Sequence, residues 1–213
     1  MGTKEHIERI IRNTYEIIQS VYDYQKEANG RKSGAPKPLS RIIYPQYRNR
    51  STRFSEQELR FVFVEQLNEE IRGGWDVYYS VETPTTKRYR FKDEEHPKVF
   101  DEKEKGGQSA QFDLVIHDNK YERIALIEFK ANNTLDKHHE KDFLKLNTEG
   151  SGTIPTYFLE IVKSSGKGTI SSLEEKKKNF NGEFRCWSCS KGDYIIKPKE
   201  QDNDSNTSTN KSK

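Results

Sequence analysis

The chain has 213 residues, of which 33% are charged and only 31% hydrophobic, and its formal net charge is +3. A mean hydropathy of −1.06 excludes a chain built mainly of membrane-spanning helices. The small net charge excludes a histone-like protein that binds nucleic acid through bulk charge. The length suits one domain with a sizeable core, and the polar composition predicts that part of the chain is unpacked.

The N-terminal segment predicts a helix and then a basic linker. Apolar residues recur at near-helical spacing from Ile7 to Tyr22, and Asn29-Gly30 ends the pattern. This helix is too polar to span a membrane and has no signal-peptide core, so we expect a cytoplasmic protein. The linker up to Arg53 interleaves arginine with tyrosine, which suits contact with phosphates and bases but also loose packing over the domain.

The second helix carries clear end signals. Ser55 with Glu58 has the spacing of a capping box, and Gly73-Gly74 ends the helix. The segment 75–81 then predicts the first strand, and the polar stretch 83–110 predicts a long loop before the next strand.

Two neighbouring runs predict a β-hairpin. Residues 111–117 alternate in polarity, and residues 123–130 are almost continuously apolar, with a short polar stretch between them. We therefore expect two antiparallel strands joined by a turn.

The register of this hairpin decides whether its polar side chains meet. A four-residue loop closed by Asp118 and Arg123 pairs residues whose numbers sum to 241, which places Asp113 opposite Glu128, about 5 Å away. A tighter turn would make Glu128 a diagonal neighbour on the same face, whereas an odd loop would separate the two carboxylates. Lys130 lies two residues beyond Glu128 and shares its face.

The rest of the chain predicts two more helices and three more strands before a polar tail. The tail, residues 200–213, has no apolar residue, and we expect it to be disordered. The expected helices lie at 136–146 and 171–180, and the expected strands at 156–162, 184–188 and 194–197.

Two carboxylates this close repel each other unless a cation lies between them. An oxygen-lined, negatively charged notch therefore predicts a hard divalent ion, Mg²⁺ or Mn²⁺. Such an ion polarises a phosphoryl oxygen and lowers the pKa of a bound water, while Lys130 positions the water or stabilises the developing charge. These features are typical of metal-assisted phosphodiester hydrolysis.

A surface cluster is the competing interpretation, in which Lys130 only neutralises Asp113 and Glu128. The Glu-x-Lys pattern also occurs at Glu174 and Glu175, within a charge run that predicts the solvated face of a helix. The copy at Glu128 differs because it ends an apolar strand and has a partner carboxylate upstream. Three hypotheses follow: a metal-dependent nuclease, a nuclease-fold binding or accessory protein with little or no catalysis, and an α/β interaction domain.

Asp113 followed by Glu128-Phe129-Lys130 resembles the motif of the PD-(D/E)xK nuclease superfamily, which includes many restriction endonucleases and Holliday-junction resolvases. Phe112 stands where the family usually has a proline. The resemblance implies that Asp113 and Glu128 ligate the metal and that Phe129 adds its main-chain carbonyl. Lys130 is then the catalytic lysine.

The resemblance also implies a fold and an activity. The fold is α/β, a mixed β-sheet flanked by helices in the restriction endonuclease-like αβββαβ order, preceded here by an N-terminal helix. We divide the chain into an N-terminal helix and basic linker (1–53), a nuclease-like domain (54–199) and a disordered tail (200–213). The implied activity is a metal-dependent nuclease, most simply a DNA endonuclease, and the resemblance allows a homodimer that cuts two strands.

The superfamily usually draws a further Glu from the first core helix, where Glu58 and Glu65 share one face. Glu58 lies nearer the expected site if the helix runs antiparallel to the next strand, and Glu65 is about 10 Å farther along the axis. The capping box gives Glu58 a structural role, whereas Glu65 stands among apolar residues where a purely solvated acid is unusual. We favour Glu58 and retain Glu65 as the alternative.

Basic residues near aromatic ones are candidate contacts for nucleic acid. Residues 1–50 hold ten Lys or Arg against five Asp or Glu, so the N-terminal side is basic although the whole chain is nearly neutral. The candidates are Lys87, Arg88 and Arg90 in the expected loop, and Arg48, Arg50 and Arg53 in the linker.

The remaining chemistry-bearing residues are two cysteines and two histidines. Cys186 and Cys189 form one Cys-x-x-Cys without the second pair that zinc would need, so we expect two reduced thiols. His138 and His139 begin the helix after the hairpin, where they predict either substrate or water positioning or a solvated helix face.

Overall fold

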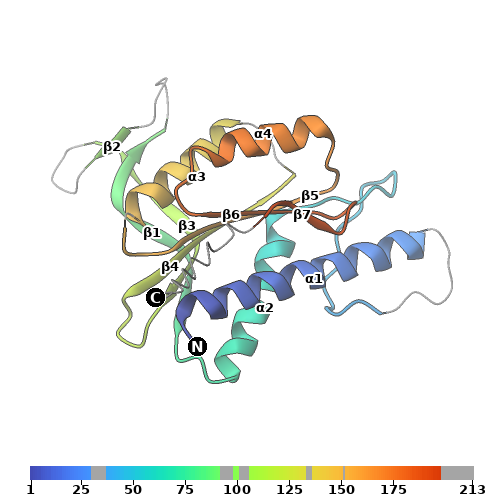
Figure 1. Cartoon of the computed structure of the whole chain (residues 1–213), viewed down its shortest axis with the longest axis horizontal. Coiled ribbons are helices and arrows are strands. Elements are labelled where there is room, and N and C mark those ends of the chain that lie inside the picture. The colour runs from blue at the N-terminus through green and yellow to red at the C-terminus, as the bar shows by residue number, and fades with distance from the viewer. Residues whose placement is uncertain (30–36, 92–97, 101–105, 133–135, 151, 198–213) are drawn as a thin grey trace, which may run out of the picture.

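The computed structural model describes residues 1–29, 37–91, 98–100, 106–132, 136–150 and 152–197. Over these residues the chain forms one mixed seven-stranded sheet with helices on both faces (Figure 1). The helices are α1 (Thr3–Asn29), α2 (Glu56–Arg72), α3 (Asp136–Glu149) and α4 (Lys167–Lys177). The strands are β1 (Tyr78–Arg90), β2 (Lys98–Phe100), β3 (Gln108–His117), β4 (Arg123–Ala131), β5 (Thr156–Val162), β6 (Glu183–Ser188) and β7 (Asp193–Ile196).

The sheet combines antiparallel and parallel pairing. Its strand order is β2-β1-β3-β4-β5-β6-β7, with β4, β5 and β6 parallel and the other neighbouring pairs antiparallel. Parallel neighbours require crossover connections, and α3 and α4 lie in those connections. The predicted α/β class, with a mixed sheet flanked by helices, is confirmed for the described residues.

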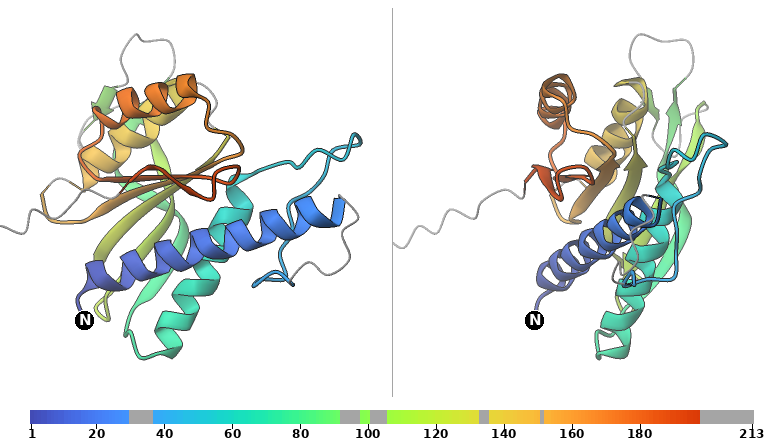
Figure 2. Two further views of the ribbon diagram at one scale, coloured as in Figure 1. Left: turned by 45° about the vertical axis from the view of Figure 1, so that its right-hand side comes forward. Right: turned by 90° about the vertical axis from the view of Figure 1, so that its right-hand side faces the viewer.

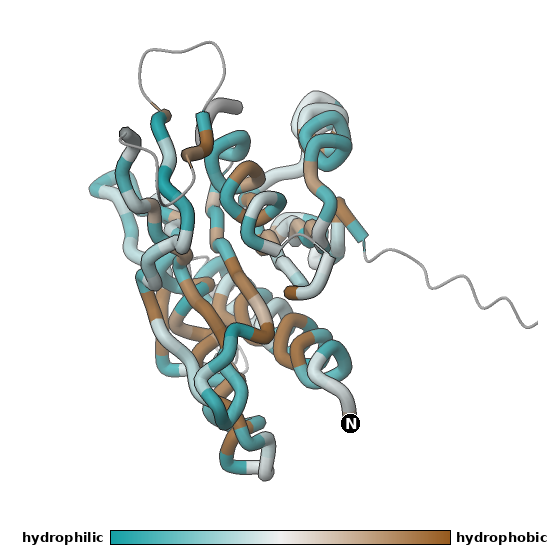
Figure 3. Tube along the Cα trace, turned by 90° about the vertical axis from the view of Figure 1, so that its left-hand side faces the viewer, coloured by the Kyte–Doolittle hydropathy of each residue, from teal (hydrophilic) through white to brown (hydrophobic). Residues whose placement is uncertain are grey.

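The helices form two layers around the sheet. α1 and α2 cover one face, and α3 and α4 cover the other (Figure 2). Along β4, Ile127 and Phe129 enter the core on the α1 and α2 side, and Leu126 enters the core on the α3 side. Because side chains alternate along a strand, Glu128 and Lys130 face α3. Figure 3 shows hydrophobic residues concentrated in the middle of the molecule, along the central strands.

The N-terminal helix belongs to the main core. Ile10, Tyr15 and Ile18 are at most 1% exposed, and the Tyr15 hydroxyl lies 3.3 and 3.1 Å from the main-chain carbonyls of Glu160 and Arg185, to which it donates. The boundary expected at residue 53 therefore does not separate two hydrophobic cores.

The basic linker is fixed to this core at Tyr44, which is 1% exposed. The Gln25 side chain accepts from the main-chain N–H of Tyr44 and donates to its carbonyl, both at 2.8 Å, and the Tyr44 ring packs against Phe54. Loose packing is therefore wrong for this part of the linker. Residues 30–36 and the tail expected at 200–213 lie outside the described part of the chain.

The loop expected at 83–110 is the largest error in the fold prediction. β1 continues to Arg90, β2 pairs with its end, and β3 begins at Gln108. Most residues of β1 are exposed or half-buried and many are Thr, Lys or Arg, so hydrophobic periodicity does not reveal the strand. The acidic stretches at 93–95 and 101–105 lie outside the described residues.

The hairpin register is confirmed, although its turn differs from the prediction. The numbers of Leu114 and its partner Ile127 sum to 241, as do those of the next two pairs. The closing pair is His117 with Arg123, which leaves an odd turn at 118–122 and a bulge beside it. An odd turn alone would place Asp113 and Glu128 on opposite faces of the sheet. The extra residue of the bulge returns them to the same face.

The later elements follow the sequence closely. β5 has the predicted bounds, and β6 and β7 each begin one residue before the predicted start. α4 begins four residues earlier than predicted and ends at Lys177. None of the described helices combines the length and the apolar content that crossing a membrane requires.

Candidate active site

An alternating chain of charged side chains connects β4 to α3. Lys145 on α3 places Nζ 2.6 Å from Glu128 Oε1 and 2.8 Å from Asp142 Oδ1. Asp142 Oδ2 lies 3.0 Å from Lys130 Nζ. The Lys145 ammonium also donates to the main-chain carbonyl of Gln111 at 2.8 Å. Glu128 and Lys130, two residues apart on β4, are thus both held by side chains of one helix.

Asp113 lies where β3 and β4 separate. Its Oδ2 accepts a hydrogen bond from the main-chain N–H of Phe129 at 2.8 Å. The last pair of the β3–β4 ladder is Leu114 with Ile127. The Asp113 side chain therefore accepts its hydrogen bond from the β4 backbone just beyond the end of the ladder. The structure therefore brings Asp113 to the strand end that carries Glu128.

The α2 carboxylate at this cluster is that of Glu56, the first residue of the helix. Glu56 Oε1 lies 3.3 Å from Lys130 Nζ. Glu58 instead accepts hydrogen bonds from the hydroxyl of Ser55 and, at 3.1 Å, from its main-chain N–H. Glu65 accepts a hydrogen bond at 3.1 Å from the hydroxyl of a linker serine. The structure brings neither of the two predicted candidates to Lys130.

Burial governs the acid–base properties of the two outer carboxyls. The Glu128 side chain is 3% exposed. Burial, followed by the charge of Asp142, raises the pKa of Glu128 well above its usual value; Lys145 opposes this rise and Asp113 adds to it. Burial also raises the pKa of Glu56, where Lys130 opposes the rise and Asp113 adds to it.

The inner groups of the cluster favour their charged forms. Burial alone would lower the pKa of Lys130, but Asp142 and then Glu56 raise it above its usual value. Burial would also lower the pKa of Lys145, and Glu128 with Asp142 raises it. Burial would raise the pKa of Asp142, but Lys145 and Lys130 lower it. Both lysines are therefore ammonium groups at neutral pH.

The cluster holds more carboxyl groups than ammonium groups. Among the described residues, four acids face two lysines, an excess of two negative charges when all are ionised. Besides burial, neighbouring carboxylates raise the pKa of both outer carboxyls: Asp142 and Asp113 act on Glu128, and Asp113 acts on Glu56. A surplus of oxygen donors of this kind is suited to a divalent cation. The acids are Glu56, Asp113, Glu128 and Asp142, and the lysines are Lys130 and Lys145.

The donors expected for a metal lie at one strand end. The N–H and carbonyl of a strand residue point to the same side, so the Phe129 carbonyl faces the same way as the N–H that donates to Asp113. In the described part of the chain, no three His, Cys, Asp or Glu side chains are arranged to hold a metal ion by themselves. Mg²⁺ is commonly held by one or two carboxylates together with waters and substrate phosphates, and Asp113 with Glu128 fits that kind of site.

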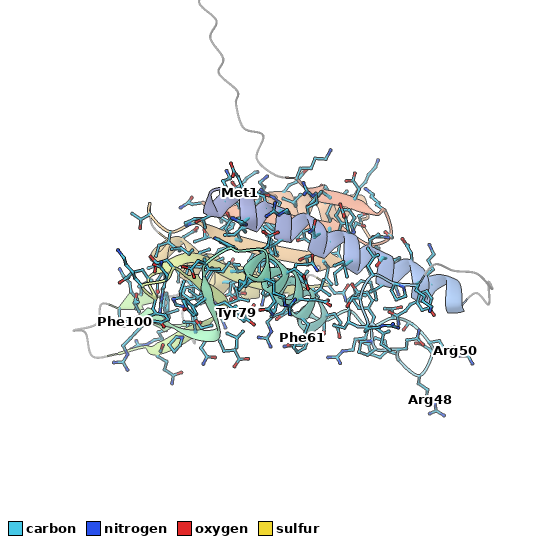
Figure 4. The ribbon with its side chains drawn as sticks, turned by 90° about the horizontal axis from the view of Figure 1, so that it is seen from below. Met1, Arg48, Arg50, Phe61, Tyr79 and Phe100 are labelled. Carbon is cyan, nitrogen blue, oxygen red and sulfur yellow. The ribbon has the colours of Figure 1, made fainter. Side chains whose placement is uncertain are left out.

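The predicted nucleic-acid contacts fall into two groups. One group lies at the end of β1 that pairs with β2, and the other lies in the linker. Figure 4 shows the labelled Phe100 of β2 and the labelled linker arginines at opposite ends of the molecule. The groups are Lys87, Arg88 and Arg90 on β1, and Arg48, Arg50 and Arg53 in the linker.

A buried pair beside the cluster is absent from the sequence prediction. His139 Nε2 lies 3.3 Å from Glu160 Oε2, and their side chains are 1% and 0% exposed. The solvated helix face is therefore wrong for His139, and the side chain of His138 lies outside the described part. Cys186 is the strand partner of Glu160; it and Cys189 are free, buried thiols, and burial raises the pKa of both.

Comparisons with protein-family models, with curated proteins and with solved structures gave no match. The functional assignment therefore depends on the chemistry of the site.

Proposed function

We propose that the protein is a metal-dependent nuclease that hydrolyses nucleic-acid phosphodiester bonds in the manner of the PD-(D/E)xK superfamily. The observation that carries the proposal is the meeting of Asp113, Glu128 and Lys130 at one strand end, within a cluster that has surplus carboxyl groups. DNA is the substrate that we favour, with an endonuclease as the simplest form of the activity and a homodimer as one arrangement for cutting two strands.

The order of the elements around the site supports this proposal. α2, β1, β3, β4, α3 and β5 follow one another in the αβββαβ order, with β2 as an insertion after β1. β3 runs antiparallel to both β1 and β4, whereas β5 runs parallel to β4. α2 packs on one face and α3 on the other, which brings an acid from each helix to the end of β4.

The metal in this proposal would be held by Asp113 and Glu128, with the carbonyl of Phe129 as a further donor. When bound there, Mg²⁺ or Mn²⁺ would polarise a phosphoryl oxygen and lower the pKa of a water molecule. Glu128 must give up its proton, or its ion pair with Lys145, to act as a ligand, so we expect metal binding to weaken as the pH falls.

Lys130 supplies positive charge to the reacting phosphate. Asp142 and Glu56 raise its pKa, so it is a permanent cation and not a general base. An ammonium held in place before the reaction stabilises charge that develops on phosphate oxygens without reorganising. Asp142 and Glu56 are positioning residues in this scheme, because they act through Lys130.

Metal binding can be tested by thermal denaturation with increasing Mg²⁺ or Mn²⁺. A cation that binds only the folded site stabilises it by about 2.7 kcal/mol at a concentration 100-fold above Kd. We expect the Tm of the wild type to rise, and the Tm of Asp113→Asn and Glu128→Gln to change little. Glu122→Gln, which removes an exposed carboxylate in the hairpin turn, should respond like the wild type. An unchanged wild-type Tm, or equal rises in all four proteins, would argue against the site.

A second function is favoured by the position of Lys145. Its ammonium already lies as a cation beside Glu128 and Asp142. This arrangement suits a nuclease fold that binds nucleic acid without cutting it. Nucleic-acid binding without metal-dependent turnover would support that function.

A further inference from the structure

A cavity of about 440 Å³ lies beside the candidate site, at the end of the sheet marked by Phe100 in Figure 4. Its walls come from the end of β1, the start of β3 and the side of α3. The volume falls within the range of pockets that hold small organic ligands. The residues that matter here are Tyr89, Arg90, Phe91, Gly107 and Lys141.

Two aromatic rings make a fixed platform in this cavity. Tyr89 and Phe91 stack with centroids 5.5 Å apart and an interplanar angle of 8°. Tyr89 is 1% exposed, and its hydroxyl lies 3.2 Å from the Glu149 carboxylate, to which it donates. The ring of Phe91 is only half-buried. A planar ligand can therefore stack on Phe91 without moving Tyr89, but it must share the ring with the side chain of Lys141, whose Nζ also lies over it.

The cavity lining at Gly107 must remain small. Gly107 has a φ of 63°, and a Cβ there would lie 2.9 Å from the Phe100 ring and 3.0 Å from the main-chain nitrogen of Tyr89. The backbone just before β3 thus runs directly against the end of β1 at this point. The close approach gives the cavity a backbone wall in place of a side chain.

The charged residues described in the lining are cations, which suit an anion. Lys141 Nζ lies 5.4 Å from the Phe91 ring centroid, and the Arg90 guanidinium lies 5.0 Å from the Phe100 centroid. Among the described residues that line the cavity, two are cations and none is an acid. An aromatic platform beside cations suits a ligand that has both a planar ring and a phosphate.

The cavity is lined by residues close in sequence to two acids of the candidate active site. Lys141 directly precedes Asp142 on α3, and Ser109 in the cavity wall is four residues before Asp113 on β3, about 13 Å along the strand. This distance corresponds to about four stacked nucleotides, or fewer in an extended strand. A strand whose scissile phosphate lies near Asp113 would therefore be long enough to reach the cavity.

We propose that this cavity binds one unpaired nucleotide, with its base on Phe91 and its phosphate near Lys141 and Arg90. A base in a duplex has both faces stacked, so it must be unpaired to enter. The substrate class is then nucleic acid that is single-stranded or has an unpaired segment. This inference rests on the proposed nuclease function for the reaction, but its binding step does not require cleavage.

Binding is measured without turnover by fluorescence anisotropy in EDTA. The probes are a labelled single-stranded DNA oligonucleotide and the same sequence as a blunt duplex, with an unlabelled mononucleotide as competitor. We expect the single strand to bind more tightly than the duplex. Phe91→Ala should raise the Kd for the single strand about 5- to 150-fold, which is the range for loss of one base–aromatic stack, and Lys141→Ala should raise it and reduce its salt dependence.

Matched variants outside the cavity give the controls. Tyr121→Ala removes an aromatic side chain that is 70% exposed, and Lys120→Ala removes an exposed lysine in the same turn. Both should bind like the wild type. Equal Kd values for Phe91→Ala and the wild type, tighter binding of the duplex, no binding of either probe, or a mononucleotide that binds as tightly as the strand would each overturn the inference.

The same variants distinguish this inference from the proposed function. If the wild type cleaves DNA and Phe91→Ala leaves KM and the preference for single strands unchanged, the inference fails while the nuclease function stands. If no nucleic acid is cleaved but single-strand binding still depends on Phe91 and Lys141, the inference stands and the nuclease function fails.

Discussion

Lys130 is the residue on which the candidate site is centred, because it contacts acids from two helices on different faces of the sheet. Asp113, Glu128 and Lys130 could be predicted because they lie on neighbouring strands joined by a short turn, where register alone decides proximity. Asp142 and Lys145 could not, since their approach depends on how α3 lies over the sheet.

The sequence contained a signal for Glu56 that the prediction of the helix carboxylate did not use. The capping box occupies Glu58, the third residue of the helix, and leaves the acidic first residue without a role. The sequence prediction favoured Glu58 because it compared only the distances of the candidate residues from the strand ends, measured along the helix axis. The cap itself fixes the direction of the Glu58 carboxylate, toward Ser55 and away from Lys130.

Three isosteric variants distinguish the acids of α2. Glu56→Gln removes a charge that positions Lys130, so we expect it to lower the cleavage rate about tenfold or more. Glu58→Gln should change the stability little, because glutamine also fits this position of a capping box, and it should leave the rate nearly unchanged, as should Glu65→Gln. Rates and unfolding free energies of all three check this. A larger rate loss in Glu58→Gln than in Glu56→Gln would contradict the assignment.

At the scale of elements, α1 and α2 are joined by an ion pair outside the site. Glu70 of α2 accepts hydrogen bonds from Arg9 of α1, with Arg9 Nε 2.5 Å from Oε1, and lies 2.7 Å from His6 Nδ1. The His6 ring stacks on Trp75 at 4.6 Å. The hydrogen bond from Arg9 lowers the pKa of Glu70, partly against burial.

The pH dependence of stability follows from this lowered pKa. A carboxyl whose folded pKa is below its unfolded value stabilises the protein above the unfolded value, and that contribution is lost as the pH falls through the folded pKa. We therefore expect Glu70→Gln to have a lower Tm than the wild type at pH 7 and a similar Tm at strongly acidic pH. Melting curves from pH 7 to pH 2 measure the difference. A constant difference across that range would show that Glu70 acts through packing alone.

Elements were predictable where burial was strong and where the end signals were local. β5 is buried along its whole length, and its bounds match the prediction. The first strand was predicted at 75–81, but its continuation to Arg90 and the short edge strand β2 were missed, because a strand rich in exposed Thr, Lys and Arg has no hydrophobic period. The hairpin register was right for an incomplete reason, since the turn is odd and a bulge between Arg123 and Ala125 restores the pairing.

At the scale of the whole molecule, α1 is part of the folding unit. The helix buries a row of apolar side chains against the same cluster as α2 and the sheet. Each is worth about 1.5–3 kcal/mol, so together they contribute at least as much as the net stability of an ordinary domain. Each is at most 1% exposed, and they are Ile7, Ile10, Ile11, Tyr15, Ile18 and Val21.

Removal of α1 should therefore unfold the protein. We expect a chain that begins at residue 30 to lose cooperative thermal unfolding and near-ultraviolet circular dichroism, and not to behave as an independent domain. The full chain with Lys4→Ala, an exposed position on the same helix, is the control. Cooperative unfolding of the truncated chain near the wild-type Tm would show that residues 54–199 fold alone.

The central claim is that the charge cluster cleaves phosphodiester bonds, and the most direct measurement is cleavage itself. Labelled single-stranded DNA, duplex DNA and single-stranded RNA are incubated with Mg²⁺ or Mn²⁺ and with wild type or Lys130→Met. We predict that the wild type cuts at least one substrate and that Lys130→Met, still folded by circular dichroism, cuts it about 100-fold more slowly or worse. A wild type that cuts no substrate with either metal, or a Lys130→Met variant that cuts at the wild-type rate, would contradict the account.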